Sequence, residues 1–392
     1  MNRTASRRSF LAAAGLALPA AASAARSADL QQPAKPQPHA GSAAPAIEYR
    51  VLGKTGLKVT TVGFGCMITS DGSVIERAAD MGVTYFDTAR VYQNGNNERM
   101  VGAALKSRRR NIVLSSKSGA HTRADALAHL DTSLKELGTD YLDIWYLHGK
   151  SRPEDITDEL IDAQQTAKQA GKIRFAGVST HQGQPVLVPF LAAHPKIDVI
   201  LSAYNFTLDP AVGAVLEQAS NAGKGIVGMK VMAGGFRRMS PDDPKYKILK
   251  QDGGMLSALK WVIRSRGVHT TIPSMTDNDQ LEENFKAMSA PFGHEDEKRL
   301  SAQLEFISPL YCRMCGECQG QCRQGLPVED TLRFLTYAEG YGQFALGREH
   351  FLSLAPAHVA ASCTDCDSCT VSCRHGVRVP ERMLRAQELF RC

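Results

Sequence analysis

The sequence predicts an α/β protein in which a (β/α)8 TIM barrel is followed by a small, mostly helical domain. Short apolar runs alternate with helical patterns from residue 59 to residue 274. Two dense runs of cysteine follow between residues 312 and 373. At 392 residues, the chain is long enough for a large barrel and a second unit. We therefore divide it into the segments 1–25, 26–46, 47–305 and 306–392.

The first segment, 1–25, has the layout of a signal peptide. Arg7 and Arg8 precede Phe-Leu, an apolar run of small residues covers 12–25, and Ala-Ser-Ala at 22–24 is a candidate cleavage site. A membrane anchor is the alternative, but the run is shorter than the ~20 apolar residues that a spanning helix needs. The paired arginines resemble a twin-arginine export signal. We expect a periplasmic or otherwise exported protein that meets the export machinery and has no membrane span when mature.

Residues 26–46 are rich in Pro, Ala, Gln and Ser, which predicts a flexible linker. The net charge of +6 is scattered along the chain, and its densest basic run, Arg108 to Arg110, is typical of a solvated helix end. Because no basic stripe with interleaved aromatic residues is present, the sequence does not favour a nucleic-acid partner.

A hairpin at Tyr49–Val59, with a turn at Gly53-Lys54-Thr55-Gly56, opens the barrel segment. Eight runs rich in apolar residues are predicted strands: 59–66, 83–86, 112–116, 142–147, 173–179, 199–204, 225–230 and 270–274. Helical patterns lie between them, for example at 124–137, 159–171 and 255–266.

Three successive predicted strands end in Asp87, Lys117 and His148, and Tyr92 follows Asp87 by five residues. Each residue has an ordinary structural interpretation: a turn aspartate, a packed tyrosine, a buried ion pair and a core histidine. Active groups of such barrels lie at the C-terminal ends of the strands, so we expect these four to meet.

These four residues resemble the Asp, Tyr, Lys and His tetrad of the aldo-keto reductase family. The neighbouring Glu98 and Gly102 also fit the pattern of that family, and the resemblance runs from Tyr49 to Asn284. It implies an oxidoreductase that reduces a small-molecule carbonyl, or oxidises an alcohol, with NAD(P)H.

The residue types indicate a mechanism. Tyr92 is expected to exchange the proton, and a nearby Lys117 cation to lower the pKa of this phenol from about 10. Asp87 is expected to hold Lys117 in place, and His148 to donate a hydrogen bond to the carbonyl oxygen. The nicotinamide supplies the hydride.

The resemblance also implies cofactor contacts. Ser179 and Thr180 correspond to the polar pair that holds the carboxamide, although the family usually has Asn at the position of Thr180. Tyr204 is the expected stacking aromatic residue, and Lys230 lies beyond it. The adenosine end is expected to involve Ser274, Gln280, Glu283 and Asn284.

Relatives that prefer NADPH carry Lys and Arg near the positions of Ser274 and Gln280. Without those cations the 2′-phosphate loses its charged partners. We therefore expect NADH to serve at least as well as NADPH, or both to bind weakly.

Two cysteine runs share the spacing C-x2-C-x2-C-x3-C and are offset by 373 − 322 = 51 residues. This is the pattern of bacterial ferredoxins, in which three thiolates hold one 4Fe–4S cluster and the fourth reaches the other cluster. Disulfides, zinc and a repeat that has lost its metal are the alternatives. We expect at least one cluster and favour two, held by Cys312, Cys315, Cys318, Cys322, Cys363, Cys366, Cys369 and Cys373.

The proline that usually follows the fourth cysteine is replaced by Arg323 and Arg374, whose charge should raise the reduction potential. Residues 332–351, between the runs, look helical, so this segment resembles a helical dicluster ferredoxin. Of the other cysteines, Cys66 is expected to pack near the barrel mouth, and Cys392 has no assigned role.

The leading hypothesis is an exported aldo-keto reductase linked to iron–sulfur electron transfer. Nicotinamide exchanges two electrons as hydride whereas each cluster exchanges one, so a redox partner protein or a flavin is a candidate intermediary, although no flavin motif is visible. The alternative is an electron-transfer or redox-sensing protein whose barrel only binds a ligand or partner.

Overall fold

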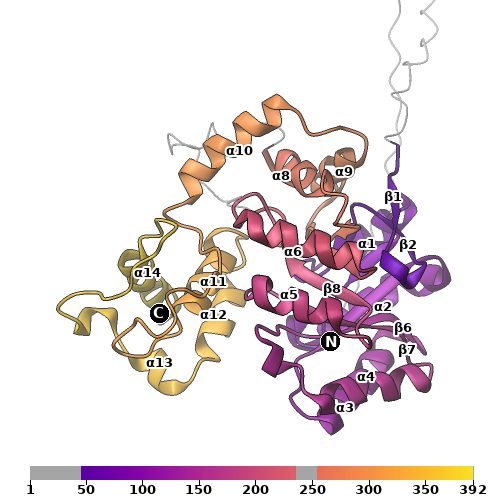
Figure 1. The fold of residues 1–392 in the computed structure, drawn as a ribbon, viewed down its shortest axis with the longest axis horizontal. Coiled ribbons are helices and arrows are strands. Elements are labelled where there is room, and N and C mark those ends of the chain that lie inside the picture. The colour runs from indigo at the N-terminus through magenta and orange to yellow at the C-terminus, as the bar shows by residue number, and fades with distance from the viewer. Residues whose placement is uncertain (1–45, 235–253, 392) are drawn as a thin grey trace, which may run out of the picture. The chain divides into compact units, whose positions relative to one another are not determined.

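The computed structural model describes residues 46–234 and 254–391 (Figure 1). The predicted signal peptide 1–25, nearly all of the linker 26–46, and Cys392 lie outside the described residues. Among the helices of the described part, none is both long and apolar enough to cross a membrane.

The predicted hairpin is confirmed, because β1 (Tyr49–Val51) and β2 (Lys58–Thr60) pair in antiparallel register. The prediction of one core strand over residues 59–66 is wrong. The Thr60 hydroxyl donates to the Val62 carbonyl at 2.7 Å, and this local bond accompanies a break in the extended run. Only β3 (Phe64–Gly65) continues into the main sheet.

Eight parallel strands form the main sheet in the order β3 to β10. Parallel bridges from Val62 to Thr271 and from Gly65 to Ser274 join its first and last strands, so the sheet closes into the predicted barrel. The remaining strands are β4 (Tyr85–Asp87), β5 (Val113–Ser118), β6 (Leu142–Leu147), β7 (Ile173–Thr180), β8 (Val199–Ala203), β9 (Gly225–Met229) and β10 (Thr270–Thr271).

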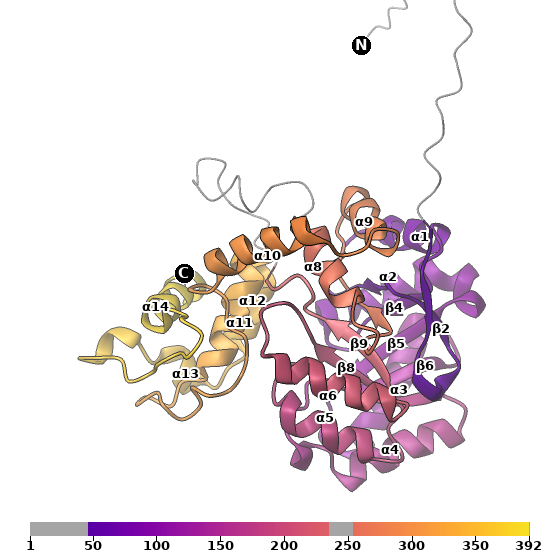
Figure 2. The ribbon, with the colours of Figure 1, turned by 45° about the horizontal axis from the view of Figure 1, so that its top comes forward.

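Helices surround the strands (Figures 1 and 2). The α3 helix shows why they begin and end where they do: the Thr122 hydroxyl accepts from the Asp125 amide at its start, and Gly138 ends it with a φ of 62°. The helices of the barrel are α1 (Gly72–Asp80), α2 (Asn96–Leu105), α3 (Arg123–Leu137), α4 (Asp158–Gln169), α5 (Gln184–Ala193), α6 (Pro210–Asn221), α8 (Gly254–Ile263), α9 (Asn278–Phe285) and α10 (His294–Ile307).

The barrel has an inner and an outer apolar core, because successive strand residues point to opposite faces. The inner core contains Tyr85 and Tyr146, whose hydroxyls lie 2.7 Å apart. The outer core packs strands against helices and includes Phe86 and Trp145. Since all eight strands run the same way, their C-terminal ends share one mouth.

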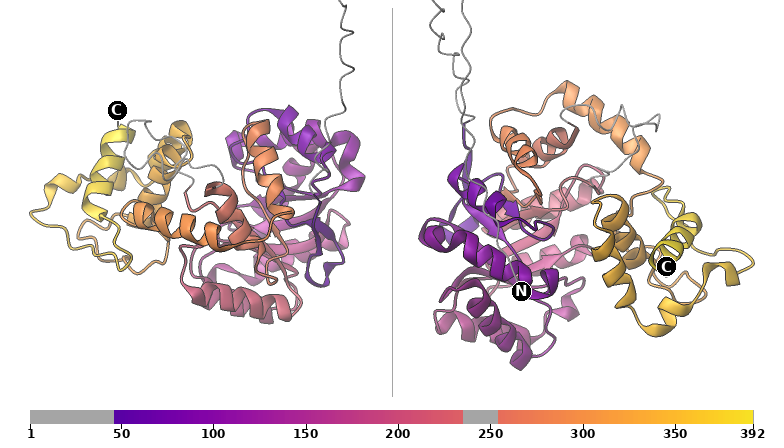
Figure 3. Two further views of the ribbon diagram at one scale, coloured as in Figure 1. Left: turned by 90° about the horizontal axis from the view of Figure 1, so that it is seen from above. Right: turned by 180° about the vertical axis from the view of Figure 1, so that it is seen from behind.

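The C-terminal part is helical, with α11 (Val328–Glu339), α12 (Phe344–Leu352), α13 (Pro356–Ala360) and α14 (Val379–Arg391) (Figure 3). The helical region predicted at 332–351 is divided into α11 and α12, and Gly342 in the break has a φ of 69°. Phe334, Phe351 and Phe390 form a small core here, and Met67 of the barrel packs against it.

Candidate active site

The structure brings the four predicted catalytic residues together at the barrel mouth. The Lys117 ammonium, on β5, contacts the carboxylate of Asp87, the last residue of β4. It also donates to the Tyr92 hydroxyl at 3.3 Å and to the Thr88 carbonyl at 2.7 Å. The His148 ring, just beyond β6, lies nearly perpendicular to the Tyr92 ring, with 6.0 Å between centroids.

Burial dominates the electrostatics of these groups. It raises the pKa of Asp87 and lowers the pKa of Lys117, while the attraction between the two opposes both shifts. Burial, and then the Lys117 cation, lowers the pKa of His148 to about 3, so the imidazole is neutral at physiological pH. It can therefore donate one hydrogen bond without carrying charge.

The expected lowering of the Tyr92 pKa is wrong for this state of the site. Burial holds the pKa of Tyr92 well above its ordinary value, and the Asp87 carboxylate adds to the rise. The Lys117 cation is already engaged by Asp87, which limits its effect on the phenol. Tyr92 is therefore a protonated phenol, ready to donate.

The loop that carries Tyr92 is held from both sides. Gln93 adopts a left-handed conformation and donates its side-chain amide to the Thr69 carbonyl at 2.8 Å. Behind the loop, the fully buried Glu98 pairs with Arg90 and accepts from the Ser116 hydroxyl at 2.6 Å. These contacts hold in place the loop that carries Tyr92.

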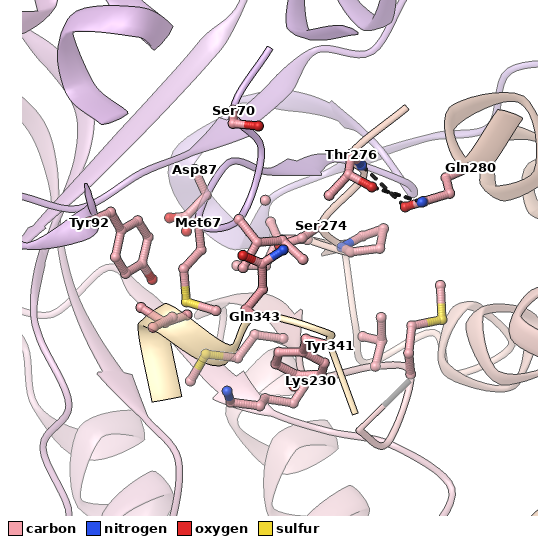
Figure 4. Close-up of a pocket in the computed structure, with 18 of the residues that line it drawn as sticks. Met67, Ser70, Asp87, Tyr92, Lys230, Ser274, Thr276, Gln280, Tyr341 and Gln343 are labelled. Carbon is pink, nitrogen blue, oxygen red and sulfur yellow. Dashed lines mark hydrogen bonds between the residues drawn. The ribbon is translucent and has the colours of Figure 1, made fainter. Parts of the chain in front are cut away.

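A cavity of about 660 Å³ opens beside the tetrad, which is within the size range of small-molecule sites. Tyr92 and Gln280 lie at opposite ends of it, and Asp87 and Lys230 lie on opposite sides (Figure 4). Part of its wall comes from the C-terminal part of the chain, between the end of α11 and the last turns of α12: Tyr341, Gln343, Ala345, Leu346 and Glu349.

Three of the predicted cofactor residues, Lys230, Ser274 and Gln280, line this cavity. Gln280 is held in place because its side-chain amide donates to the Thr276 hydroxyl at 2.8 Å. Glu283 does not line the cavity.

Ser179 and Thr180 lie at the C-terminal end of β7, as predicted, but their hydroxyls make local bonds. Ser179 accepts from the Gly149 amide at 2.9 Å, and Thr180 donates to the Gln182 carbonyl at 2.6 Å. Neither residue lines the cavity.

Tyr204 does not occupy the expected stacking position. Its ring lies 5.1 Å from the Trp261 ring, centroid to centroid, in the outer core. Ala203 faces the inner core, so alternation along the chain turns Tyr204 outward. The residue that reaches the cavity from this region is Met229, at the end of β9.

Asn284 offers the best structural test of a nucleotide site. Its side chain is buried, and its amide nitrogen has no hydrogen-bond partner in the described part of the chain. A buried donor without a partner is costly. It belongs to α9, the same short helix as the cavity residue Gln280, but it does not itself line the cavity. An amide donor without a partner at this position is consistent with the predicted contact between Asn284 and the adenosine end of the cofactor.

Sequence reasoning missed several residues of this site. His181 lines the cavity directly after the predicted Thr180, and the strand-end rule that identified His148 would have found it. The hydroxyl of Tyr337, a residue of α11, accepts from the Lys230 ammonium at 3.2 Å. No local signal indicates that contact, because 107 residues separate the two.

The cysteines of the two runs are interleaved. Cys312, Cys315 and Cys318 line one hollow together with Cys373. Cys363, Cys366 and Cys369 line a second hollow together with Cys322. Within residues 46–234 and 254–391, no group of His, Cys, Asp and Glu converges closely enough to hold a single metal ion.

Burial and ion pairing set the charge around the cysteines. Burial raises the pKa of Cys312 to about 12 and that of Cys363 to about 11, so both thiols are protonated without metal. Arg374 pairs with Glu317, which offsets its charge near the first hollow. Cys66 is fully buried in the outer core, as expected.

Comparison with known proteins is consistent with this geometry. Residues 71–305 match the Aldo/keto reductase family. The chain is 26% identical over 285 residues to the uncharacterized oxidoreductase YqkF of Bacillus subtilis, covering 62% of this chain and 92% of that protein. It is 28% identical over 285 residues to L-galactose dehydrogenase of Arabidopsis thaliana, covering 62% and 88%. Among solved structures, aldo-keto reductase AKR11C1 from Bacillus halodurans superimposes with a TM-score of 0.57 and 28% identity, over 65% of this chain and 96% of that one.

Proposed function

The chain belongs to the aldo/keto reductase family and is an NAD(P)H-dependent oxidoreductase of that type, and we propose that it reduces a carbonyl, or oxidises the corresponding alcohol, at the barrel mouth. The observation that carries this proposal is the Lys117 ammonium, which contacts both the Asp87 carboxylate and the Tyr92 hydroxyl beside a neutral His148. A purely structural ion pair would not require the phenol.

The residues of the site have distinct roles in this reaction. When bound, a nicotinamide dinucleotide supplies hydride to the carbonyl carbon, and Asn284, Ser274 and Gln280 are the residues we propose to hold its adenosine end. Tyr92 gives its proton to the carbonyl oxygen, so the product is a neutral alcohol. His148 donates a hydrogen bond to the oxygen as charge develops there. Lys117 orients Tyr92 and stabilises the phenolate that remains.

We propose that NADH serves at least as well as NADPH, or that both bind weakly. Ser274 and Gln280 line the cavity, and neither can offer a positive charge to a 2′-phosphate. Steady-state kinetics with both nucleotides measure this directly, and a KM for NADPH far below that for NADH would contradict it.

The decisive test is turnover of benzaldehyde by full-length, anaerobically purified protein, with Tyr92→Phe as the variant. Loss of a general acid typically costs 10²- to 10⁴-fold, so we expect the rate to fall by about that factor. Val91→Ala is a matched control, because Val91 is exposed beside Tyr92 and has no role in the tetrad. Turnover that survives in Tyr92→Phe would overturn the proposed acid.

We propose further that the C-terminal part, 306–392, is a ferredoxin-like domain with two 4Fe–4S clusters. The support is the interleaving of the cysteines, which puts three from one run and the last from the other around each hollow. A cluster is wider than a single metal ion, so its ligands surround a larger space. The thiolates of Cys312, Cys315, Cys318 and Cys373 would hold one cluster. Those of Cys363, Cys366, Cys369 and Cys322 would hold the second.

The cysteines also favour a second candidate function, electron transfer or redox sensing with a barrel that only binds a ligand. Tyr92→Phe separates the two: electron transfer to the clusters should survive in the variant, whereas carbonyl turnover should not. Because hydride moves two electrons and each cluster moves one, we propose a redox partner protein between the clusters and any donor.

We also propose export by the twin-arginine pathway, with cleavage after residue 24 or 25, a linker to residue 46, and a barrel over 47–305. The support is Arg7 and Arg8 before the apolar run. The proposed cluster domain agrees with this route, because its metal would have to be inserted before export. Fractionation of cells that express the wild type and an Arg7→Lys/Arg8→Lys variant tests this, since the variant should stay inside.

A further inference from the structure

The cavity has a partly buried cation on the side opposite Asp87. Lys230 follows β9 with a φ of 57°, and its ammonium lies 3.2 Å from the Tyr337 hydroxyl of α11. It also lies 4.5 Å from the centre of the Tyr337 ring and 5.4 Å from that of Tyr341. Among the described residues, Lys230 forms no ion pair with a carboxylate. Buried ammonium groups usually have an anionic partner.

Lys230 keeps its charge in this environment. Burial opposes the charge, but the neighbouring Tyr337 and Tyr341 outweigh burial, and the pKa of Lys230 lies above its ordinary value. The same cation, together with Arg333, lowers the pKa of Tyr337 although burial acts in the opposite direction. The charge of Lys230 is therefore available to a ligand in the cavity, and Tyr337, which does not itself line the cavity, positions the ammonium.

Two buried nitrogen atoms of residues close to Lys230 have no hydrogen-bond partner among the described residues. Arg333 lies one turn before Tyr337 on α11, and one of its terminal nitrogens pairs with Asp330 at 2.7 Å, but its Nε is buried without a partner in the described part of the chain. His181 lines the cavity, and its Nδ1 is also buried without a partner among the described residues. The field of Arg333 reaches both His148 and His181.

The negative charges near the cavity do not neutralise this cluster. Asp87 is engaged by Lys117 on the other side, and Asp330 pairs with Arg333 from outside. Glu349 also lines the cavity, but its side chain is exposed to solvent, which screens its charge. The part of the cavity wall formed by Lys230 and His181, with Arg333 close to both but outside the lining, therefore carries positive charge that no carboxylate neutralises.

We propose that Lys230, positioned by Tyr337 and supported by Arg333, binds the carboxylate of an anionic carbonyl substrate in the cavity, so that the substrate class is oxo acids. The inference rests on the proposed reductase function and adds the charge of its substrate. The pyrophosphate of the dinucleotide offers the same anionic oxygens, but Lys230 points toward α11, away from Gln280 and the predicted adenosine end (Figure 4).

The test compares 4-carboxybenzaldehyde with benzaldehyde as substrates of the full-length, cluster-loaded protein. We expect the wild type to have the higher kcat/KM for the carboxylated aldehyde. In Lys230→Met this preference should fall roughly 10- to 100-fold, the loss typical of a charged hydrogen bond. Lys230→Arg keeps the cation and should keep the preference. Lys298→Met, which removes an exposed lysine of α10, is the control that should leave it unchanged.

Other outcomes would overturn the proposal in distinguishable ways. If Lys230→Met raises the KM for NADH or NADPH while the ratio of the two aldehydes stays constant, Lys230 binds the pyrophosphate. If both aldehydes lose activity equally with no effect on KM, Lys230 acts in folding or chemistry. If the wild type turns over neither aldehyde, the reductase function has failed. Calorimetric binding of 4-carboxybenzyl alcohol against benzyl alcohol still tests the anion subsite in that case.

Discussion

Lys117 is the residue on which the catalytic geometry depends. Its ammonium is almost fully buried and is shared by the Asp87 carboxylate, the Thr88 carbonyl and the Tyr92 hydroxyl. Removing a cation from water is costly, so this arrangement persists only because all three oxygens face it. The residue types in the sequence were sufficient to name Asp87 and Tyr92 as partners, but not the Thr88 carbonyl. They were not sufficient to give the sign of the Tyr92 pKa shift, which depends on how completely the fold excludes water.

The raised pKa of Tyr92 predicts a characteristic pH dependence. Carbonyl reduction needs the protonated phenol, which persists above pH 9, so kcat/KM for reduction should not fall between pH 6 and 9. Alcohol oxidation needs the phenolate, so its kcat/KM should rise with pH across this range. His148, with a pKa of about 3, adds no step there. Steady-state pH profiles in both directions check this. A kcat/KM for reduction that already declines as the pH rises toward 8 would contradict the prediction.

The buried pair predicts a strong effect of Asp87→Asn on stability. The substitution leaves the Lys117 cation buried without its counter-charge, which typically costs about 3–5 kcal/mol. Both tryptophans of the chain, Trp145 and Trp261, lie in the barrel, so urea unfolding followed by fluorescence reports on the barrel alone.

The double variant Asp87→Asn/Lys117→Met is the control for this experiment. It removes both charges, so we expect it to recover most of the lost stability and none of the activity. Equal losses in the single and double variants would show that the Asp87–Lys117 attraction does not stabilise the barrel.

Strand ends and helix ends decide which of these side chains can meet. β4, β5 and β6 were predictable because each is a short apolar run, and alternation along parallel strands then fixes the mouth of the barrel. The same alternation turned Tyr204 away from the site, which the sequence pattern alone did not show because its strand is buried on both faces. The contact of α11 with the barrel was not predictable, since its residues are remote in sequence from β9.

Gly340, the residue that follows α11, lies in close contact with the chain just beyond β9. A Cβ atom at Gly340 would lie 2.2 Å from the Gly234 carbonyl oxygen, just beyond β9, and 2.7 Å from that of Thr336. Gly340→Ala should therefore push α11 away from Lys230, at a cost of about 1–3 kcal/mol. Because Tyr341 and Gln343 follow Gly340 in the cavity wall, we expect KM for the carbonyl substrate to rise more than kcat falls.

Gly72→Ala is the matched control for this substitution. A Cβ at Gly72 meets only ordinary contacts, 3.6 Å to Met100 and 3.8 Å to Ala104, so KM and stability should stay near the wild-type values. An unchanged KM in Gly340→Ala, with or without lower stability, would show that the C-terminal helices do not shape the substrate site.

The chain as a whole joins two units that sequence reasoning treated as separate. The barrel, the tetrad and the cysteine spacing were all visible in the sequence, because each depends on local periodicity or on a short motif. The shared cavity depends on long-range contacts such as the one between Lys230 and Tyr337, which no local pattern encodes. The C-terminal helices therefore complete the wall of the reductase site, and the cysteine hollows belong to the same part of the chain.

The interleaved cysteines predict a pattern of iron loss that depends on which pair is changed. Wild-type protein should carry about eight iron atoms per chain, and Cys315→Ser or Cys373→Ser should each retain about four. Since both residues line the same hollow, the double variant should also retain about four. Cys315→Ser/Cys322→Ser removes a ligand from each hollow and should retain almost none. If each cluster were instead held by the four cysteines of one run, Cys315→Ser/Cys373→Ser should retain almost no iron. Cys315→Ser/Cys322→Ser should then retain about four atoms. Cys66→Ala, in the barrel core, is the control that should keep the full iron content when metal is measured after anaerobic purification.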